Sequence, residues 1–173
     1  MALSRRIDDI RELAELGEAG AQFRLGWAYE QGRVLPQDPV EAAKWYRKAA
    51  DQGIARAQLR LGVMYDNGRG VPQDCAEAAK WYRKAADQED AHAQFNLGVV
   101  YEDGQGVPRD YSEAARWYRK AADQGLSRAQ LNLGAMYDDG RGVPQDHAEA
   151  AKWYRKAAEQ QNAHAQLDRK SVV

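Results

Sequence analysis

The chain has 173 residues, of which 44% are hydrophobic and 29% are charged, a composition typical of a folded globular protein of one domain. Its 25 Lys and Arg residues nearly balance its 26 Asp and Glu residues, so no overall field attracts nucleic acid or an anionic membrane. A single cysteine, Cys75, excludes an intrachain disulfide, and no apolar run is long enough to span a membrane.

The N-terminal stretch MALSRRIDDIRELAEL mixes basic with acidic residues and lacks the continuous apolar segment of a signal peptide. We therefore expect a cytoplasmic protein, and a periplasmic or secreted origin only if a leader has been removed. Residues 4–19 follow the pattern of a helix that recurs later in the chain, but Asp9 stands where the later copies carry tryptophan. This difference predicts an N-terminal capping helix over residues 4–19.

The following residues form four copies of a 36-residue pattern. Each copy reads A-Q-x-x-L-G-x-x-Y, then a loop that contains glycine and proline, then E-A-A-[KR]-W-Y-R-K-A-A. The tryptophans that mark this spacing are Trp45, Trp81, Trp117 and Trp153. The glycines with the same spacing are Gly26, Gly62, Gly98 and Gly134. The four repeats are assigned to residues 20–55, 56–91, 92–127 and 128–163.

Each repeat is predicted to hold two helices. In the second repeat, the first helix covers about residues 55–66, and a step of 100° per residue gathers one set on a single side. This set is Ala57, Gln58, Leu61, Gly62, Met64 and Tyr65. A glycine in mid-helix costs about 1 kcal/mol relative to alanine, so its recurrence predicts close backbone contact with a neighbouring helix.

The second helix of that repeat covers about residues 75–87. Its apolar side alternates large aromatic residues with alanine, which allows bulky groups to pack beside small ones. The residues of this side are Ala78, Trp81, Tyr82, Ala85 and Ala86. Because neither helix can bury its apolar side alone, the repeats are predicted to stack into an all-α solenoid.

The connecting loop YDNGRGVPQD at residues 65–74 has enough glycine to suggest a phosphate-binding loop. However, a helix precedes it, Pro72 interrupts it, and the carboxylate of Asp74 at the start of the next helix would repel a phosphate. The same residues suit a helix end at Gly68 and an N-cap at Asp74, with Glu77 completing a capping box. We therefore interpret the loop as a linker.

At the C-terminus, AHAQLDRK starts like another first helix, but Arg169 and Lys170 replace its Leu-Gly pair. Residues 164–173 are therefore predicted to form a partial fifth first helix or a C-terminal cap.

The repeat resembles the Sel-one-like repeat, a relative of the tetratricopeptide repeat. The resemblance depends on A-Q-x-x-L-G-x-x-Y, on G-x-G-V-P-x-D and on A-x-x-W-[YF]-x-K-A-A, and it covers residues 20–160. It implies a right-handed α-solenoid of antiparallel helix pairs, with the first helices on the concave face. It also implies a non-catalytic scaffold or adaptor for protein partners. The departures are Val34 in the first loop, and Glu89 and Gln161 where Gly53 and Gly125 end the second helix elsewhere.

The side of the first helices that faces away from the core varies among the repeats and is unusually apolar for a solvated helix. We interpret it as a groove for an extended peptide or a partner helix, with apolar anchors between a basic and an acidic rim. An alternative for the Phe and Leu positions is packing between adjacent first helices. The predicted partner-binding residues are Phe23, Arg24, Trp27, Arg56, Leu59, Arg60, Val63, Asp66, Asn67, His92, Phe95, Asn96, Val99, Glu102, Asp103, Arg128, Leu131, Asn132 and Asp138.

Two other functions are alternatives to a protein scaffold. A ladder of twelve basic residues on the second helices, three in each (such as Lys80, Arg83 and Lys84), would suit nucleic acid or another polyanion. Acidic residues one turn away favour a solvated, internally paired face instead, so a nucleic-acid partner is not expected. A β-lactamase-like hydrolase is the other alternative, but the four serines include no S-x-x-K motif.

No cofactor, metal or catalytic residue is predicted. His92, His147 and His164 lack the spacing of metal ligands, and Cys75 is interpreted as an incidental thiol. The rows of Trp and Tyr are interpreted as core rather than as an aromatic binding site. A solenoid with an abrupt end can also stack end to end, which leaves self-association open.

Overall fold

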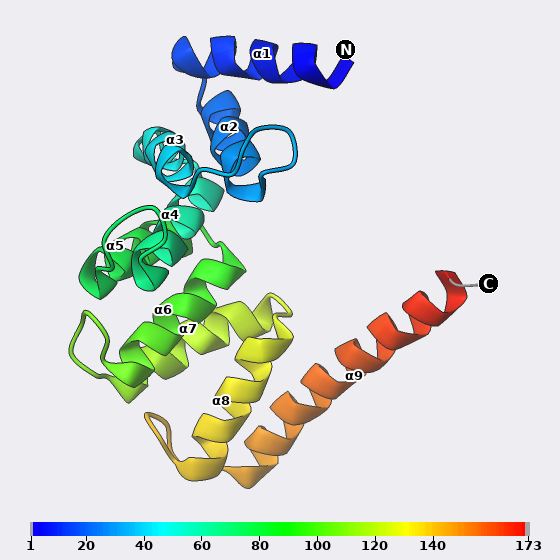
Figure 1. Ribbon diagram of the computed structural model, residues 1–173. Coiled ribbons are helices and arrows are strands. Elements are labelled where there is room, and N and C mark those ends of the chain that lie inside the picture. Colours follow the sequence, from blue (N-terminus) through cyan, green and yellow to red (C-terminus); the bar gives the residue numbers. More distant parts are fainter. Residues whose placement is uncertain (1, 172–173) are drawn as a thin grey trace. The chain divides into compact units, whose positions relative to one another are not determined.

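The computed structural model describes the backbone of residues 2–171 and the side chains of residues 7–160, and the regular secondary structure of this part consists of α-helices alone (Figure 1). This confirms the predicted all-α fold. The nine helices in this part are α1 (Ala2–Glu15), α2 (Ala19–Gln31), α3 (Pro39–Asp51), α4 (Ala55–Asn67), α5 (Cys75–Ala86), α6 (Ala91–Asp103), α7 (Tyr111–Asp123), α8 (Ser127–Asp139) and α9 (His147–Ser171). No helix in this part is long and apolar enough to cross a membrane.

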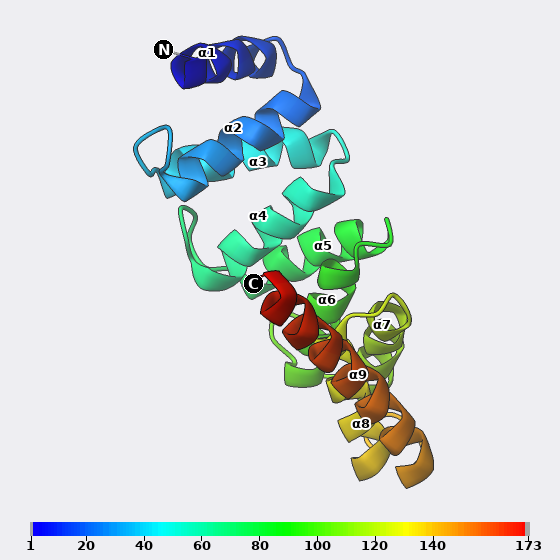
Figure 2. The same ribbon diagram turned by 90° about the vertical axis from the view of Figure 1, so that its right-hand side faces the viewer.

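The chain forms two compact units, an N-terminal unit that ends at Asp90 and a C-terminal unit that begins at Ala91. Helices α2, α4, α6 and α8 are the first helices of the repeats and are called A helices below, and α3, α5, α7 and α9 are the B helices. Each A helix packs along the B helix that follows it (Figure 2). In addition, α3 packs against α4 in the N-terminal unit, and α7 packs against α8 in the C-terminal unit.

The loops end and restart the helices largely as predicted. Gly68 adopts a left-handed φ of 64° after α4, and the Asp74 carboxylate accepts from the backbone N–H groups of Ala76 and Glu77, each at 3.0 Å. The predicted capping box is wrong in its second hydrogen bond, which would join the Asp74 N–H to the Glu77 carboxylate. The Glu77 carboxylate binds Lys80 Nζ at 2.6 Å, and the Asp74 N–H donates to the Tyr65 carbonyl at 2.9 Å, which closes the loop.

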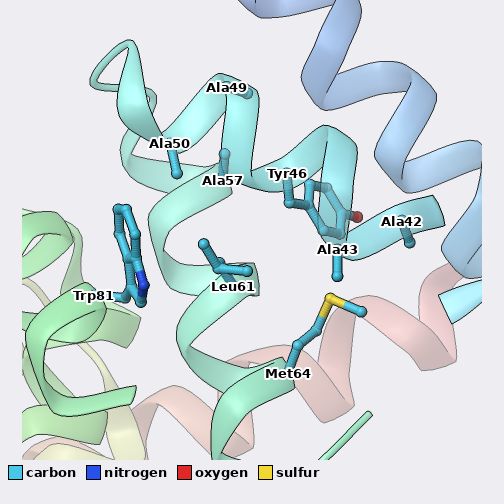
Figure 3. Packing of buried hydrophobic residues seen from close by; sticks show 9 residues of the cluster. All are labelled: Ala42, Ala43, Tyr46, Ala49, Ala50, Ala57, Leu61, Met64 and Trp81. Atoms are coloured by element: carbon cyan, nitrogen blue, oxygen red, sulfur yellow. The ribbon is translucent and has the colours of Figure 1, made fainter. Parts of the chain in front are cut away.

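The core of the N-terminal unit lies between α3, α4 and α5. Figure 3 shows small alanines of α3 against Leu61 and Met64 of α4, with Trp81 of α5 on the other side of α4. The C-terminal unit repeats this packing with Leu133 and Met136 of α8 between α7 and Trp153 of α9. The predicted apolar sides are confirmed, except that Tyr65 is only partly buried.

The recurring mid-helix glycines give room to a tyrosine ring. A Cβ added to Gly62 would lie 2.7 Å from two ring carbons of Tyr82 on the following B helix. The same contact joins Gly26 to Tyr46, Gly98 to Tyr118 and Gly134 to Tyr154. The predicted close approach of a neighbouring helix is therefore confirmed, and the neighbour is the B helix of the same repeat.

Buried glutamines fasten successive helices together, a role that the sequence pattern did not reveal. Gln58 Nε2 donates to the carbonyl oxygen of Ala50 at 3.0 Å, and its Oε1 accepts from Gln88 Nε2 at 2.8 Å. Gln22 makes the same two bonds, to the Ala14 carbonyl and from Gln52. The amides thereby satisfy backbone groups at helix ends that packing removes from water.

The two departures from the repeat pattern take different backbone forms. Gly53 and Gly125 have φ values of 90° and 88°, whereas Glu89 has a φ of 65°, inside the small left-handed region that side chains tolerate. At Gln161 the backbone does not turn, and α9 continues to Ser171. The side chains of residues 161–173, including His164, Arg169 and Lys170, lie outside the described part, and the assignment of 164–173 stays a prediction.

Replacing Glu89 by glycine is expected to stabilise the protein by about 0.5–1 kcal/mol. Glycine removes the strain of a side chain in the left-handed region, about 1–2 kcal/mol. Part of this gain is offset, because glycine also raises the conformational entropy of the unfolded chain. The free energy of unfolding from urea titration measures the change. Gly125→Ala is the matched control, because its φ of 88° should make the added Cβ destabilising although only Gln160 Nε2, at 3.5 Å, lies near it. A Glu89→Gly protein that is less stable than the parent would contradict the strain argument.

Candidate functional site

The A helices of the N-terminal unit expose an apolar and cationic surface. Trp27 of α2 is 42% exposed, and Phe23, Leu59 and Val63 are half-buried. The basic side chains on the same two helices, Arg24, Arg56 and Arg60, are all exposed. We call this set, with Trp27 as its most exposed apolar member, the N-terminal A surface.

The predicted apolar row divides into core and surface members. The Phe23 ring lies 5.6 Å from the Tyr46 ring, and Phe95 lies 5.7 Å from Tyr118, so both phenylalanines also cover the core. Packing against the core therefore accounts for part of this row, and the ring contacts are with the B helix of the same repeat, whereas the alternative interpretation placed them between adjacent first helices. Trp27 and Leu131, which is 38% exposed, lie mostly outside it.

The acidic residues near the ends of the A helices have partners inside the protein. Glu30 is only 8% exposed, accepts the Tyr46 hydroxyl at 2.6 Å and lies 3.8 Å from Arg60 Nη1. Burial, and then the hydrogen bond to Glu30, raise the pKa of Tyr46 far above its usual value. These contacts explain why carboxylates lie at helix ends where the dipole disfavours them.

The C-terminal unit has the same hydrogen bond from a tyrosine hydroxyl to a glutamate, but it carries different groups on its surface. Glu102 accepts from the Tyr118 hydroxyl at 2.7 Å and from Arg141 Nη1 at 3.3 Å. Asp138 accepts from His147 Nδ1 at 2.6 Å and remains exposed. The positions equivalent to Arg24 and Arg60 are the half-buried Asn96 and Asn132.

The remaining predicted residues of both units lie on the A helices or at their ends. Asn67 is exposed and donates to the Val63 carbonyl at 2.9 Å, and Asp66 accepts from the Tyr82 hydroxyl at 3.4 Å. Four others share these surfaces: His92, Asp103 and Arg128 are exposed, and Val99 is half-buried. The structure thus places each predicted residue on an A helix, and it gives Glu102, Asp66 and Asp138 partners that the sequence did not show.

The basic ladder of the B helices is largely engaged within each helix or with the next one. Lys44, Lys80, Arg116 and Lys152 pair with the glutamate three residues earlier, as in the Lys80–Glu77 bond. Lys48, Lys84, Lys120 and Lys156 lie 4.0–4.1 Å from the ring centroid of the tryptophan three residues earlier. Arg47 and Arg119 donate to the hydroxyls of Tyr65 and Tyr137. The W-Y-R-K spacing could have indicated the lysine–tryptophan contact, because residues three apart are helix neighbours.

The described side chains contain no cluster of three or more metal-ligating residues. Cys75 is a half-buried thiol at the start of α5. Two open hollows of about 430 Å³ each lie on the C-terminal unit. One is bordered by the end of α7 and by Lys156 and Glu159 of α9, and the other by Ser112, Arg119 and the loop at Gly142. Neither hollow brings a serine or cysteine together with a histidine.

Comparison with known proteins gives a consistent result. A family model described as the Sel1 repeat matches residues 19–54, 55–90, 91–126 and 127–162. The structure is similar to c5321, a protective antigen of uropathogenic Escherichia coli with an SLR fold (TM-score 0.86, 46% identity, 89% of this chain and 33% of that one). It is also similar to a Sel1 repeat protein from Oxalobacter formigenes (TM-score 0.83, 37% identity, 91% and 66%).

A more distant similarity, to Helicobacter pylori cysteine-rich protein B, has a TM-score of 0.58 at 23% identity, covers 74% of this chain and 92% of that one, and concerns the fold alone. The chain spans about a third of the length of c5321. A search of curated proteins finds no match.

Proposed function

The chain belongs to the Sel1 repeat family, whose members are in general non-enzymatic protein-interaction scaffolds, and from this premise we propose that it binds a partner protein through the exposed sides of its A helices. The partner contributes an extended segment or a helix. The family relationship supports a scaffold. The surface chemistry of this chain supports the particular binding side.

The exposure of Trp27 carries the proposal. An indole that is 42% exposed keeps a large apolar area in water, and tryptophan is enriched among the residues that dominate binding energy at protein interfaces. Arg24, three residues before Trp27 on α2, and Arg56 on α4 are both exposed and can pair with carboxylates of a partner. The N-terminal A surface therefore suits a segment that joins apolar anchors with acidic residues.

The C-terminal unit offers a second surface of different chemistry. Leu131 supplies an exposed apolar group, Arg128 and His92 supply exposed donors, and Asn96 and Asn132 replace two arginines by neutral amides. Such a surface suits a less acidic segment that forms hydrogen bonds. Neither a polyanion nor a hydrolase substrate is favoured. Ten of the twelve ladder cations have the intramolecular partners described above, and neither of the two hollows brings a serine or cysteine together with a histidine.

The test compares crosslinked partners of the parent protein with those of a Trp27→Ala/Arg56→Glu variant in native lysate. Loss of a binding tryptophan typically costs about 2 kcal/mol or more, so the enriched partners should fall by about 30-fold. Arg33→Glu is the matched control, because Arg33 is an exposed arginine in the loop after α2. Circular dichroism and thermal unfolding verify that all three proteins fold alike.

An unchanged partner list for Trp27→Ala/Arg56→Glu would refute the proposed surface. An equal loss in Arg33→Glu would point to charge alone rather than to the A helices.

A further inference from the structure

The exposed charges on the A helices of the N-terminal unit are all positive. The basic side chains of α2 and α4 are all exposed, and they are Arg24, Arg56 and Arg60. The acidic side chains of the same helices have partners inside the unit. Glu30 is 8% exposed, and the half-buried Asp66 accepts from the Tyr82 hydroxyl. This side of the unit is therefore complementary to an acidic partner.

Arg60 is held in place by the buried carboxylate of Glu30. Its Nη1 lies 3.8 Å from Glu30 Oε1, and the other carboxylate oxygen accepts from the Tyr46 hydroxyl at 2.6 Å. Because Tyr46 is fully buried, it fixes Glu30, and Glu30 fixes one end of a guanidinium whose side chain remains 46% exposed. A guanidinium has more N–H donors than this contact uses, so Arg60 keeps donors for a second carboxylate. The contact also joins α4 to the turn of α2 that carries Trp27, three residues before Glu30.

The C-terminal unit pairs the equivalent glutamate in a different way. Glu102 accepts from Nη1 of Arg141, in the loop after α8, at 3.3 Å. The A-helix position that holds arginine in the N-terminal unit carries the neutral, half-buried Asn132. The loop arginine of the N-terminal unit, Arg69, donates to the backbone carbonyl of Glu30 at 3.4 Å. The glutamate carboxylate therefore pairs with an A-helix cation in the N-terminal unit and with a loop cation in the C-terminal unit.

We propose that Arg60 is the specificity-determining residue of the N-terminal A surface, and that it selects an acidic protein segment in which carboxylates accompany the apolar anchor. This role rests on the proposed function. A guanidinium that is already held loses little side-chain entropy on binding, and its planar fork can form paired hydrogen bonds with a carboxylate. Glu30 is the positioning residue, and Arg24 and Arg56 add positive charge on the same helices.

The probe is a synthetic peptide array in which leucine and tryptophan anchors are combined, in varied order, with glutamate, glutamine or lysine. The parent chain should retain glutamate peptides in preference to their glutamine and lysine counterparts. Fluorescence anisotropy then measures the affinity of the best glutamate peptide, which should fall as sodium chloride is raised because exposed charges are screened. Arg60→Asn, which copies Asn132, should weaken binding of that peptide about tenfold or more and leave the weak binding of its glutamine counterpart unchanged.

Arg69→Asn is the matched control, because it removes the same charge near the same glutamate but from the loop after α4. It should bind the glutamate peptide within about twofold of the parent, as expected for an exposed charge outside the contact. Arg60→Lys keeps a cation beside Glu30 but lacks the planar fork, so its affinity should lie between those of the parent and Arg60→Asn. Circular dichroism and thermal unfolding verify that each variant folds like the parent.

Each of the following outcomes would overturn the proposal. One is a preference of the array for glutamine or lysine peptides, and another is an equal loss of affinity in Arg69→Asn. Loss of binding in Trp27→Ala but not in Arg60→Asn would remove the role of Arg60 and leave the proposed surface standing, whereas loss in neither variant would refute both. A single-stranded oligonucleotide that binds more tightly than the best peptide, and fails to bind Arg60→Asn, would assign the surface to nucleic acid.

Discussion

Gly98→Ala is expected to lower the free energy of unfolding by about 1–3 kcal/mol, although alanine is the better helix former by about 1 kcal/mol. The added Cβ would lie 2.5 and 2.6 Å from two ring carbons of Tyr118. That ring cannot move aside easily, because it is fully buried and its hydroxyl donates to Glu102. The steric cost should therefore exceed the gain in helix propensity.

Urea unfolding followed by circular dichroism measures this effect, and Gly20→Ala serves as the control. Gly20 also lies in an A helix, but its added Cβ would meet only the carboxylate end of Glu18, which can move. Gly20→Ala should therefore be neutral or stabilising. In a Tyr118→Ala background, the cost of Gly98→Ala should disappear, since the ring that it strikes is gone. A persistent cost in that background would show that the clash is not the cause.

Much of the fold follows from local rules that the sequence carries openly. The 36-residue spacing predicts the repeated helix pairs, Asp74 predicts an N-cap, and Gly68 predicts a helix end. The glycines at the spacing of Gly62 predict close contact with a neighbouring helix, because a helix keeps a costly residue only for a packing reason. Which side chain makes that contact depends on how two helices cross, and the pattern within one helix does not contain that information.

The hydrogen-bond partners of polar side chains were harder to predict, because they depend on how deeply each side chain is buried and on how far it reaches. The sequence placed acidic residues on an exposed rim, yet Glu30 reaches the buried Tyr46 hydroxyl at 2.6 Å. Asp66, one methylene shorter, stops at 3.4 Å from the Tyr82 hydroxyl. For the candidate site, the helical period located the exposed A-helix sides, but it left open whether Phe23 is a surface residue or packs inside, and the structure shows that its ring also covers the core.

The free energy of unfolding is expected to fall steeply above pH 10 because of Tyr46 and Tyr118. Both rings are fully buried, and burial followed by a hydrogen bond to glutamate raises the pKa of each hydroxyl above its usual value near 10. Below pH 10 both states are neutral at these groups. Above pH 10 the unfolded chain releases the protons and the folded chain retains them, so the unfolded state binds fewer protons and stability declines with pH.

Each tyrosine should remove about 1.4 kcal/mol per pH unit, or about 2.7 kcal/mol per unit for the pair. Urea titrations between pH 9 and pH 12 measure the slope, and absorbance of tyrosinate reports when the rings ionise. Tyr46→Phe/Tyr118→Phe isolates the two hydroxyls from lysines that titrate in the same range. This variant should be less stable at neutral pH, because Glu30 and Glu102 each lose a donor, but its stability should decline less steeply above pH 10. Equal slopes for parent and variant would mean that the two buried hydroxyls do not control alkaline unfolding.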